Sequence, residues 1–187
     1  MRTDFLEIEH KYIVAPDYDA DALGVRLVGL GAGPEKRVEV RDTYFYVPGH
    51  EGAVFRHRLD RELHQLTVKN RPADSAVRRE INLDLAGADA VDTVAAFLET
   101  GWGPCVRLEL TKSIRVWEVL GCEVVHYAAR RPDGYKVHCV EFEATGAGSP
   151  EAALATLEAI GRACEFDPEH RTRHSLFHLM TEDHGGV

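Results

Sequence analysis

The feature that most constrains the fold of this chain is a repeated alternation of polar and apolar residues, which has the period of a β-strand. The alternation recurs in segments separated by turn signals such as Pro48-Gly49 and Pro132-Asp133-Gly134. These segments cover residues 4–14, 37–47, 53–60, 63–70, 77–85, 105–118, 121–128 and 135–144. Short strands joined by hairpin-like turns favour an antiparallel sheet that closes into a barrel.

Three other segments show the period of an amphipathic helix, at residues 17–30, 89–100 and 150–163. The last begins with Ser149 as a cap and Pro150 at the first helical position. A short fourth helix is expected at about 173–181. The predicted fold class is α+β, a closed eight-stranded antiparallel β-barrel with helices packed outside. We expect one domain over residues 1–187, with the barrel at about 4–144 and C-terminal helices at about 150–181.

Composition excludes several classes of protein. Apolar residues make up 44% of the chain, and no apolar run approaches the roughly 18 residues of a membrane helix. The 31 acidic residues outnumber the 22 basic ones, whereas a general nucleic-acid binder shows the opposite balance. The first residues, Met1-Arg2-Thr3-Asp4, are already charged. We therefore expect no signal peptide, no membrane or nucleic-acid partner, and a cytoplasmic location.

Familiar metal and nucleotide motifs are missing from the sequence. The four cysteines lie far apart and form no C-x-x-C pair, so zinc and thioredoxin-like sites lack their spacing. The glycine patterns of P-loops and dinucleotide-binding folds do not occur. Any ligand site must therefore be built from residues that are distributed over the strands.

Charged residues share one face of several predicted strands, opposite an apolar face, and they gather by sign. The carboxylates are Glu7, Glu9, Glu141 and Glu143, and the cations are Lys11, Arg56, Arg58, Lys69 and Arg78. A solvated outer surface would explain any one of these strands. However, the apolar stripes of three helices need a surface to cover. If the helices cover the apolar strand faces, the charged faces point into the barrel.

A cationic interior restricts the chemistry of the site. An unpaired buried charge costs several kcal/mol, so such an interior needs a counter-charge. Phosphate oxygens suit arginine and lysine, and arginine can bind them in bidentate fashion. The glutamates would then hold a hard divalent cation, Mg²⁺ or Mn²⁺. Metal, phosphate and cations together are the equipment for phosphoryl chemistry.

A set of motifs in a fixed order also resembles a known family. They are Glu7-Ile8-Glu9-His10-Lys11, Asp42-Thr43-Tyr44-Phe45, Phe55-Arg56-His57-Arg58, Leu66-Thr67-Val68-Lys69, Arg78-Arg79-Glu80 and Val140-Glu141-Phe142-Glu143. The first is similar to the E-x-E-x-K signature of the CYTH, or triphosphate tunnel metalloenzyme, family, which includes class IV adenylate cyclases and thiamine triphosphatases. The others resemble the successive strands of that family, in family order.

The resemblance implies a triphosphate-binding tunnel and a role for each matching residue. The implied catalytic residues are Glu7, Glu9 and Lys11. The implied triphosphate-binding residues are Lys11, Arg56, Arg58, Lys69, Arg78 and Arg115. The implied metal-side carboxylates are Glu7, Glu9, Glu80, Glu141 and Glu143, with Mg²⁺ or Mn²⁺ as the cofactor. Glu80 is also a candidate to orient an arginine.

The sequence departs from the family pattern in four places. In one of them, Ser175-Leu176 stands where the family's C-terminal helix has Ser-Tyr. Asn82 stands where the pattern has a third acid after Arg78 and Glu80. The K-x-R pair of the sixth strand is stretched to Lys112-Ser113-Ile114-Arg115, so both cations face inward only with a β-bulge. We choose Arg115 for the phosphate contact, with Arg107 on the same face as its rival. Glu123 is a weak match for the acid of the seventh strand.

Three functions remain open at this point. The first is a metal-dependent hydrolase of a small triphosphate, with tripolyphosphate, thiamine triphosphate or ATP as substrate. The second is a class IV adenylate cyclase, which would form cyclic AMP and pyrophosphate from ATP. The third is a non-catalytic module that binds polyphosphate, which the missing acid at Asn82 makes worth considering. The sequence leaves the physiological substrate open, and it is compatible with a homodimer.

Overall fold

The structure is a computed structural model, and it describes residues 4–50, 52–70, 77–86, 90–145 and 149–181. Its main body is one antiparallel sheet. The strands are β1 (Asp4–Val14), β2 (Lys36–Tyr46), β3 (Ala53–Leu59), β4 (His64–Asn70), β5 (Val77–Asp84), β6 (Val106–Val119), β7 (Cys122–Arg130) and β8 (Lys136–Thr145). They match the segments expected from the alternation to within about two residues.

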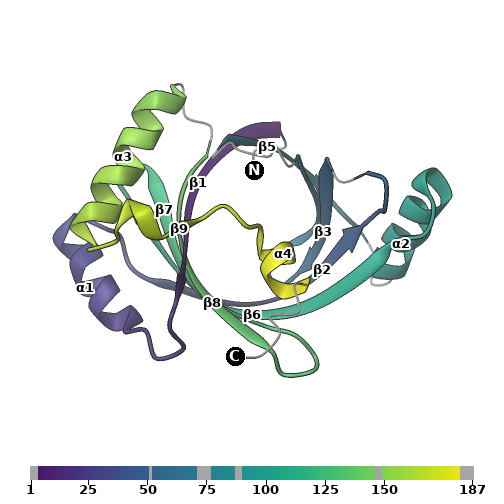
Figure 1. Cartoon of the computed structure of the whole chain (residues 1–187), viewed down its shortest axis with the longest axis horizontal. Helices are drawn as coiled ribbons and strands as arrows, with labels where there is room; N and C mark the ends of the chain where they lie inside the picture. Colours follow the sequence, from purple (N-terminus) through teal and green to yellow (C-terminus); the bar gives the residue numbers. More distant parts are fainter. Residues whose placement is uncertain (1–3, 51, 71–76, 87–89, 146–148, 182–187) are drawn as a thin grey trace.

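The sheet closes on itself. The strands pair in the order β5-β4-β3-β2-β6-β7-β8-β1, and β1 also pairs with β5, so an eight-stranded barrel results. All of these pairings are antiparallel. Figure 1 looks along the barrel and shows the strands as a ring. The predicted closed antiparallel barrel is confirmed.

Three helices cover the outside of the barrel (Figure 1). Helices α1 (Ala20–Gly29) and α3 (Pro150–Ala163) pack with outward-facing apolar residues of β1, β6, β7 and β8. Helix α2 (Ala90–Trp102) lies on the other side, over Phe45 and Leu66. Among the described residues, no helix is long and apolar enough to cross a bilayer.

Local sequence signals set the starts of two of these helices. The Asp19 carboxylate accepts hydrogen bonds from the backbone N–H groups of Asp21 and Ala22, which caps α1. The Ser149 hydroxyl accepts one from the N–H of Ala152, and Pro150 follows at the first helical position of α3. The cap predicted at Ser149 is therefore confirmed.

The short helix α4 (Leu176–Thr181) takes a different position, within the outline of the barrel in Figure 1. Its buried residues pack against inward-facing apolar residues of the strands, such as Val54 and Val137. The Phe177 ring stacks on Tyr46 at the end of β2. The guanidinium of Arg131, in the turn between β7 and β8, donates a hydrogen bond to the carbonyl of Met180. Helix α4 thus packs inside the barrel end that contains the β2–β3 and β7–β8 turns.

A two-residue strand, β9 (Arg171–Thr172), precedes α4 and was not expected from the sequence. It pairs with β1 at Lys11 and Tyr12, beyond the stretch where β5 pairs with β1. The Arg171 side chain donates to the Tyr12 hydroxyl at 2.9 Å. This strand therefore fixes the C-terminal segment to the barrel before it turns into α4.

Candidate active site

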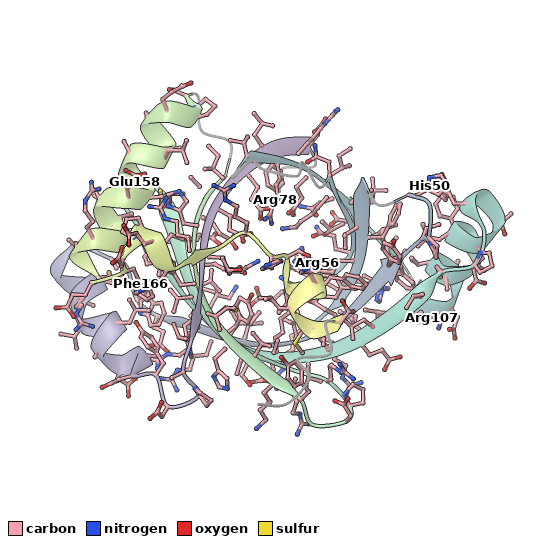
Figure 2. The ribbon with its side chains drawn as sticks, viewed as in Figure 1. His50, Arg56, Arg78, Arg107, Glu158 and Phe166 are labelled. Carbon is pink, nitrogen blue, oxygen red and sulfur yellow. The ribbon has the colours of Figure 1, made fainter. Side chains whose placement is uncertain are left out.

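A cavity of about 1280 Å³ occupies the interior of the barrel, and inward-facing residues of all eight strands line it. Residues 173–178 complete its wall at the end filled by α4. The opposite end, beside the β3–β4 and β6–β7 turns, carries the exposed residues Glu62, Glu118 and Glu123. Figure 2 shows Arg56 and Arg78 inside the ring of strands and Arg107 outside it.

Strand alternation brings nearly all of the predicted site residues to this one cavity. The predicted residues that line it are Glu7, Glu9, Lys11, Arg56, Arg58, Lys69, Arg78, Glu80, Glu141 and Glu143. Their apolar neighbours on the same strands face the helices, as the argument from the helix stripes requires.

Three carboxylates converge in the cavity wall. One oxygen from each of Glu7, Glu9 and Glu143 lies within 4.8 Å of the others. Glu9 and Glu143 are direct partners across the β1–β8 pairing. Burial, and then the charges of Glu7 and Glu141, raise the pKa of Glu143 well above its ordinary value. An all-carboxylate cluster of this kind fits a hard divalent cation, which would offset the repulsion among the carboxylates.

Lysine 69 bridges two acids at the edge of this cluster. Its ammonium group donates to both oxygens of Glu7, at 2.8 and 2.9 Å, and lies 2.6 Å from Glu80 Oε2. Burial opposes the charge on Lys69, but Glu7 and Glu80 outweigh it and raise the lysine pKa. Burial likewise opposes the charge on Glu80, yet Lys69 and Arg56 lower its pKa to about 2. Both groups are therefore charged near neutral pH.

Lysine 11 has a similar place between two other acids. Its ammonium group lies 2.9 Å from Glu9 Oε1 and 3.0 Å from Glu141 Oε1. The Tyr127 hydroxyl donates to the same Glu141 oxygen at 2.6 Å. Arg78 approaches the other oxygen of Glu9 at 3.4 Å. Lys69 and Lys11 thus each link one acid of the three-carboxylate cluster, Glu7 or Glu9, to an acid outside it, Glu80 or Glu141.

A second charged cluster surrounds Asp42, a residue to which sequence reasoning gave no role. This buried carboxylate accepts a bidentate hydrogen bond from Arg58, at 2.8 and 2.9 Å. The Lys112 ammonium lies 2.6 Å from Asp42 Oδ2 and donates to the Tyr44 hydroxyl at 2.9 Å. Burial opposes the Asp42 charge, but Lys112 and Arg58 lower its pKa far below the ordinary value. The alternation of residues 36–46 could have indicated that Asp42 faces inward.

The choice of Arg115 for a phosphate contact is corrected by the structure. Strand β6 pairs with β2 and β7 without a bulge, so Lys112 faces the cavity while Arg115 faces outward. Arg115 pairs outside the barrel with Glu35 and Asp21 and covers the Trp117 ring. Its rival Arg107 is also outside, paired with Asp92 (Figure 2). Glu123 does line the cavity, at the exposed end.

Asn82, which replaces the third acid of the family pattern, is buried in a chain of hydrogen bonds. The Thr67 hydroxyl donates to Asn82 Oδ1 at 2.7 Å, and Asn82 Nδ2 donates to Glu80 Oε1 at 3.0 Å. Arg56 in turn donates to the Thr67 hydroxyl at 3.2 Å. Asn82 therefore positions Glu80 and adds no charge to the cavity.

The cations of the cavity already have counter-charges, which the sequence argument had assigned to a bound ligand. Carboxylates from β1, β2, β5 and β8 lie beside them, so a bound polyanion is not the only available counter-charge. Arg56 has the longest ion pair of these cations, 3.9 Å to Glu80. Its buried Nε has no hydrogen-bond partner among the described residues. That N–H group is available for an anionic ligand.

The C-terminal part of the cavity wall, residues 173–178, was expected only as a short helix facing a core. The side chains of His174 and His178 stack at the cavity, with ring centroids 4.5 Å apart. Nothing in the local pattern of this segment distinguishes a helix that enters a barrel from one that packs on its outside. Long-range pairing of β9 with β1 decides its place.

Comparison with known proteins identifies a matching family and solved structures with a similar fold. The family model of the CYTH domain matches residues 6–160. A conserved hypothetical protein from Pyrococcus furiosus has a TM-score of 0.67 at 18% identity, over 91% of this chain and 97% of that one. A candidate adenylate cyclase from Bacillus halodurans has a TM-score of 0.67 at 15% identity, over 97% and 100%. The Mimivirus capping enzyme triphosphatase has a TM-score of 0.51 at 10% identity, over 85% and 90%.

No curated protein matches the sequence. The structural likenesses lie at low identity and therefore show the fold they share with this chain. The family match rests on the sequence itself and extends over most of the barrel and into α3. The chain belongs to the CYTH domain family.

Proposed function

We propose that this chain is a metal-dependent enzyme that hydrolyses small triphosphates such as tripolyphosphate, thiamine triphosphate or ATP. The observation that carries the proposal is the single cavity in which Glu7, Glu9 and Glu143 converge beside buried arginines and lysines. Membership of the CYTH family supports it. A cytoplasmic location remains part of the proposal, on the sequence grounds given above.

The cations of the cavity would bind the phosphate oxygens. Arg56 offers an unpartnered buried N–H group, and Lys69, Arg78 and Arg58 line the same wall. Burial opposes the charge on Lys11, but Glu141 and Glu9 outweigh it and raise the pKa of the lysine. Lys11 therefore keeps its proton and acts as a fixed cation rather than as a base.

Hydrolysis would proceed by attack of water on the terminal phosphorus and cleavage of its bond to the bridging oxygen. The leaving pyrophosphate or nucleoside diphosphate carries the developing negative charge, which buried cations stabilise without having to reorganise. Glu7, Glu9 and Glu143 are the residues that would hold Mg²⁺ or Mn²⁺. When bound there, the cation would supply charge neutralisation to the phosphate oxygens as a Lewis acid.

The test is a substrate panel with Mg²⁺ or Mn²⁺, scored separately for orthophosphate, pyrophosphate and cyclic nucleotide. We expect orthophosphate from at least one triphosphate, and loss of that activity in Glu9→Gln. Glu39→Gln removes an exposed carboxylate of β2 and should leave the rate unchanged. Tight binding without turnover of any triphosphate would exclude an enzyme and leave a polyphosphate-binding module.

The volume of the cavity favours a second candidate, an adenylate cyclase. Beyond the charged residues, apolar side chains line the wall, among them Val38, Ile114, Val116 and Val125. A cavity of about 1280 Å³ exceeds the roughly 300–1,000 Å³ of ordinary small-molecule pockets, so it has room for an organic group as well as its phosphates. Cyclic AMP and pyrophosphate from ATP, without orthophosphate, would establish this function in place of hydrolysis.

A further inference from the structure

The carboxylates that suit a divalent cation also serve as counter-ions of the phosphate-binding cations. Lys69 holds both oxygens of Glu7, and Arg78 approaches one oxygen of Glu9 at 3.4 Å. Glu7 and Glu9 belong to the three-carboxylate cluster with Glu143. The same oxygens therefore have two competing uses.

These two uses oppose each other at Glu7. One ammonium group donates to both of its oxygens, so a divalent cation on those oxygens would lie beside that positive charge unless Lys69 withdraws. Withdrawal alone would leave a largely buried ammonium group with one acid fewer, and breaking a buried ion pair in this way is strongly destabilising. Binding of a divalent cation to the carboxylates is therefore unfavourable unless Lys69 gains a new partner.

A triphosphate supplies that new partner. Lys69 is already held at 2.6 Å by Glu80, so it can leave Glu7 while it keeps one acid and gains a phosphate oxygen. Arg78 can likewise leave Glu9 for a phosphate oxygen, because Lys11 remains 2.9 Å from Glu9 Oε1. Conversely, a triphosphate alone would draw Lys69 away from Glu7, and the carboxylate left without its ammonium partner would repel it.

We propose that Lys69 and Arg78 couple the binding of a divalent cation to the binding of a triphosphate. In the empty barrel Lys69 neutralises Glu7, and Arg78 together with Lys11 neutralises Glu9; when both ligands bind, Lys69 and Arg78 transfer to phosphate oxygens. Each ligand thereby removes the obstacle to the other, and the coupling is reciprocal. This inference rests on the proposed function for the nature of the two ligands.

The test measures Mn²⁺ binding by electron paramagnetic resonance, with and without a tripolyphosphate analogue whose bridging oxygens are replaced by NH groups. We expect the analogue to tighten Mn²⁺ binding by about ten-fold or more in the wild type, a coupling of the usual size. In Lys69→Gln, Mn²⁺ alone should bind more tightly, because Glu7 is released, and the effect of the analogue should shrink. Lys69→Arg should restore it.

Arg115→Gln is the matched control, since it removes a cation that lies outside the barrel, and it should retain the full coupling. Arg78→Gln provides a second variant if Lys69→Gln fails to fold. Equal Mn²⁺ affinity with and without the analogue, or weaker Mn²⁺ binding in Lys69→Gln, would overturn the coupling while turnover still supports the proposed function. Failure of both ligands to bind would overturn both.

Discussion

Single carboxyl groups in the barrel differ in how readily they release a proton, and the pKa of Glu143 lies well above that of an ordinary glutamate. Burial and the neighbouring acids raise its pKa in the folded protein, whereas the unfolded chain has a glutamate pKa of about 4.3. Between those two values the folded state binds more protons than the unfolded state. The free energy of unfolding must therefore fall as the pH rises through this interval.

Glu143→Gln should remove this pH dependence, because glutamine stays neutral at every pH. In metal-free buffer we expect the variant to melt above the wild type at pH 8 and close to it at pH 5. A gain of 1 kcal/mol corresponds to roughly 2–4 °C for a chain of this size. Calorimetry or circular dichroism would measure the difference. Parallel pH profiles would show that Glu143 ionises normally in the folded protein.

The inward position of Lys112 and the outward position of Arg115 predict opposite results for two similar substitutions. Lys112→Met removes a buried cation and should lower kcat/KM for tripolyphosphate about ten-fold or more, since one charged hydrogen bond is worth about 1.5–3 kcal/mol. Arg115→Met breaks outer ion pairs and should leave kcat/KM unchanged. Steady-state assays with Mn²⁺ would measure both, and the reverse result would contradict the register of β6.

Asn82→Asp restores the acid of the family pattern and should destabilise this chain. The new carboxylate would face Glu80, from which Asn82 Nδ2 is now 3.0 Å away, and the hydrogen bond to Glu80 would be lost. We expect the free energy of unfolding to fall by about 1–3 kcal/mol in metal-free urea titrations. Asn70→Asp, on an exposed residue of β4, is the control and should have little effect. An unchanged Asn82→Asp midpoint would show that Glu80 is not fixed by this amide.

The side of the sheet that a residue faces was predictable where polar and apolar residues alternate regularly. It was not predictable where it depends on the pairing with a neighbouring strand. The inward positions of Glu7, Arg56 and Glu141 follow from the two-residue period of a strand alone. Lys112 and Arg115 differ in parity, so only one can face inward without a bulge. The pairing of β6 with β2 and β7 decides between them, and a single sequence does not contain that register.

At the scale of elements, helix α4 is the part whose position matters most to the cavity. Phe177 is 7% exposed and packs on Tyr44 and Tyr46 inside the barrel end. Phe177→Ala should lower the free energy of unfolding by about 3–5 kcal/mol, the usual cost of deleting a buried aromatic ring. Chemical denaturation would measure it.

The matched control is Phe97→Ala on α2, whose side chain is 59% exposed. It should change the free energy of unfolding by less than about 1 kcal/mol. Equal losses in the two variants would contradict the packing of α4 within the barrel. A large loss for Phe97→Ala alone would show that its exposed face is covered in solution.

The long strands and helices were predictable because each repeats its pattern several times. The eight predicted strand segments match β1 to β8, and α3 begins directly after its predicted cap, Ser149. Strand β9 has only two residues, Arg171 and Thr172, which is too short for any period to show. It forms because Arg171 reaches the Tyr12 hydroxyl, a contact between residues 159 positions apart.

At the scale of the whole molecule, the closure of the sheet was predictable but the charge balance inside it was not. Helices with apolar stripes need the apolar faces of the strands, which leaves the charged faces for the interior. Which acid neutralises which cation depends on side-chain distances, as the Lys69–Glu7 and Arg58–Asp42 pairs show. The net charge of −9 says nothing about these contacts, because it averages over the exterior and the interior.

Among the described residues, α4 packs inside one end of the barrel, and the acidic residues Glu62, Glu118 and Glu123 lie at the other end, beside the β3–β4 and β6–β7 turns. On the proposed function, we expect substrate to enter and product to leave at this second end, because α4 narrows the first. Pyrophosphate should then act as a competitive inhibitor of tripolyphosphate hydrolysis, raising KM without changing kcat, since it would occupy the same cations. A long polyphosphate should be shortened from the end that enters the barrel.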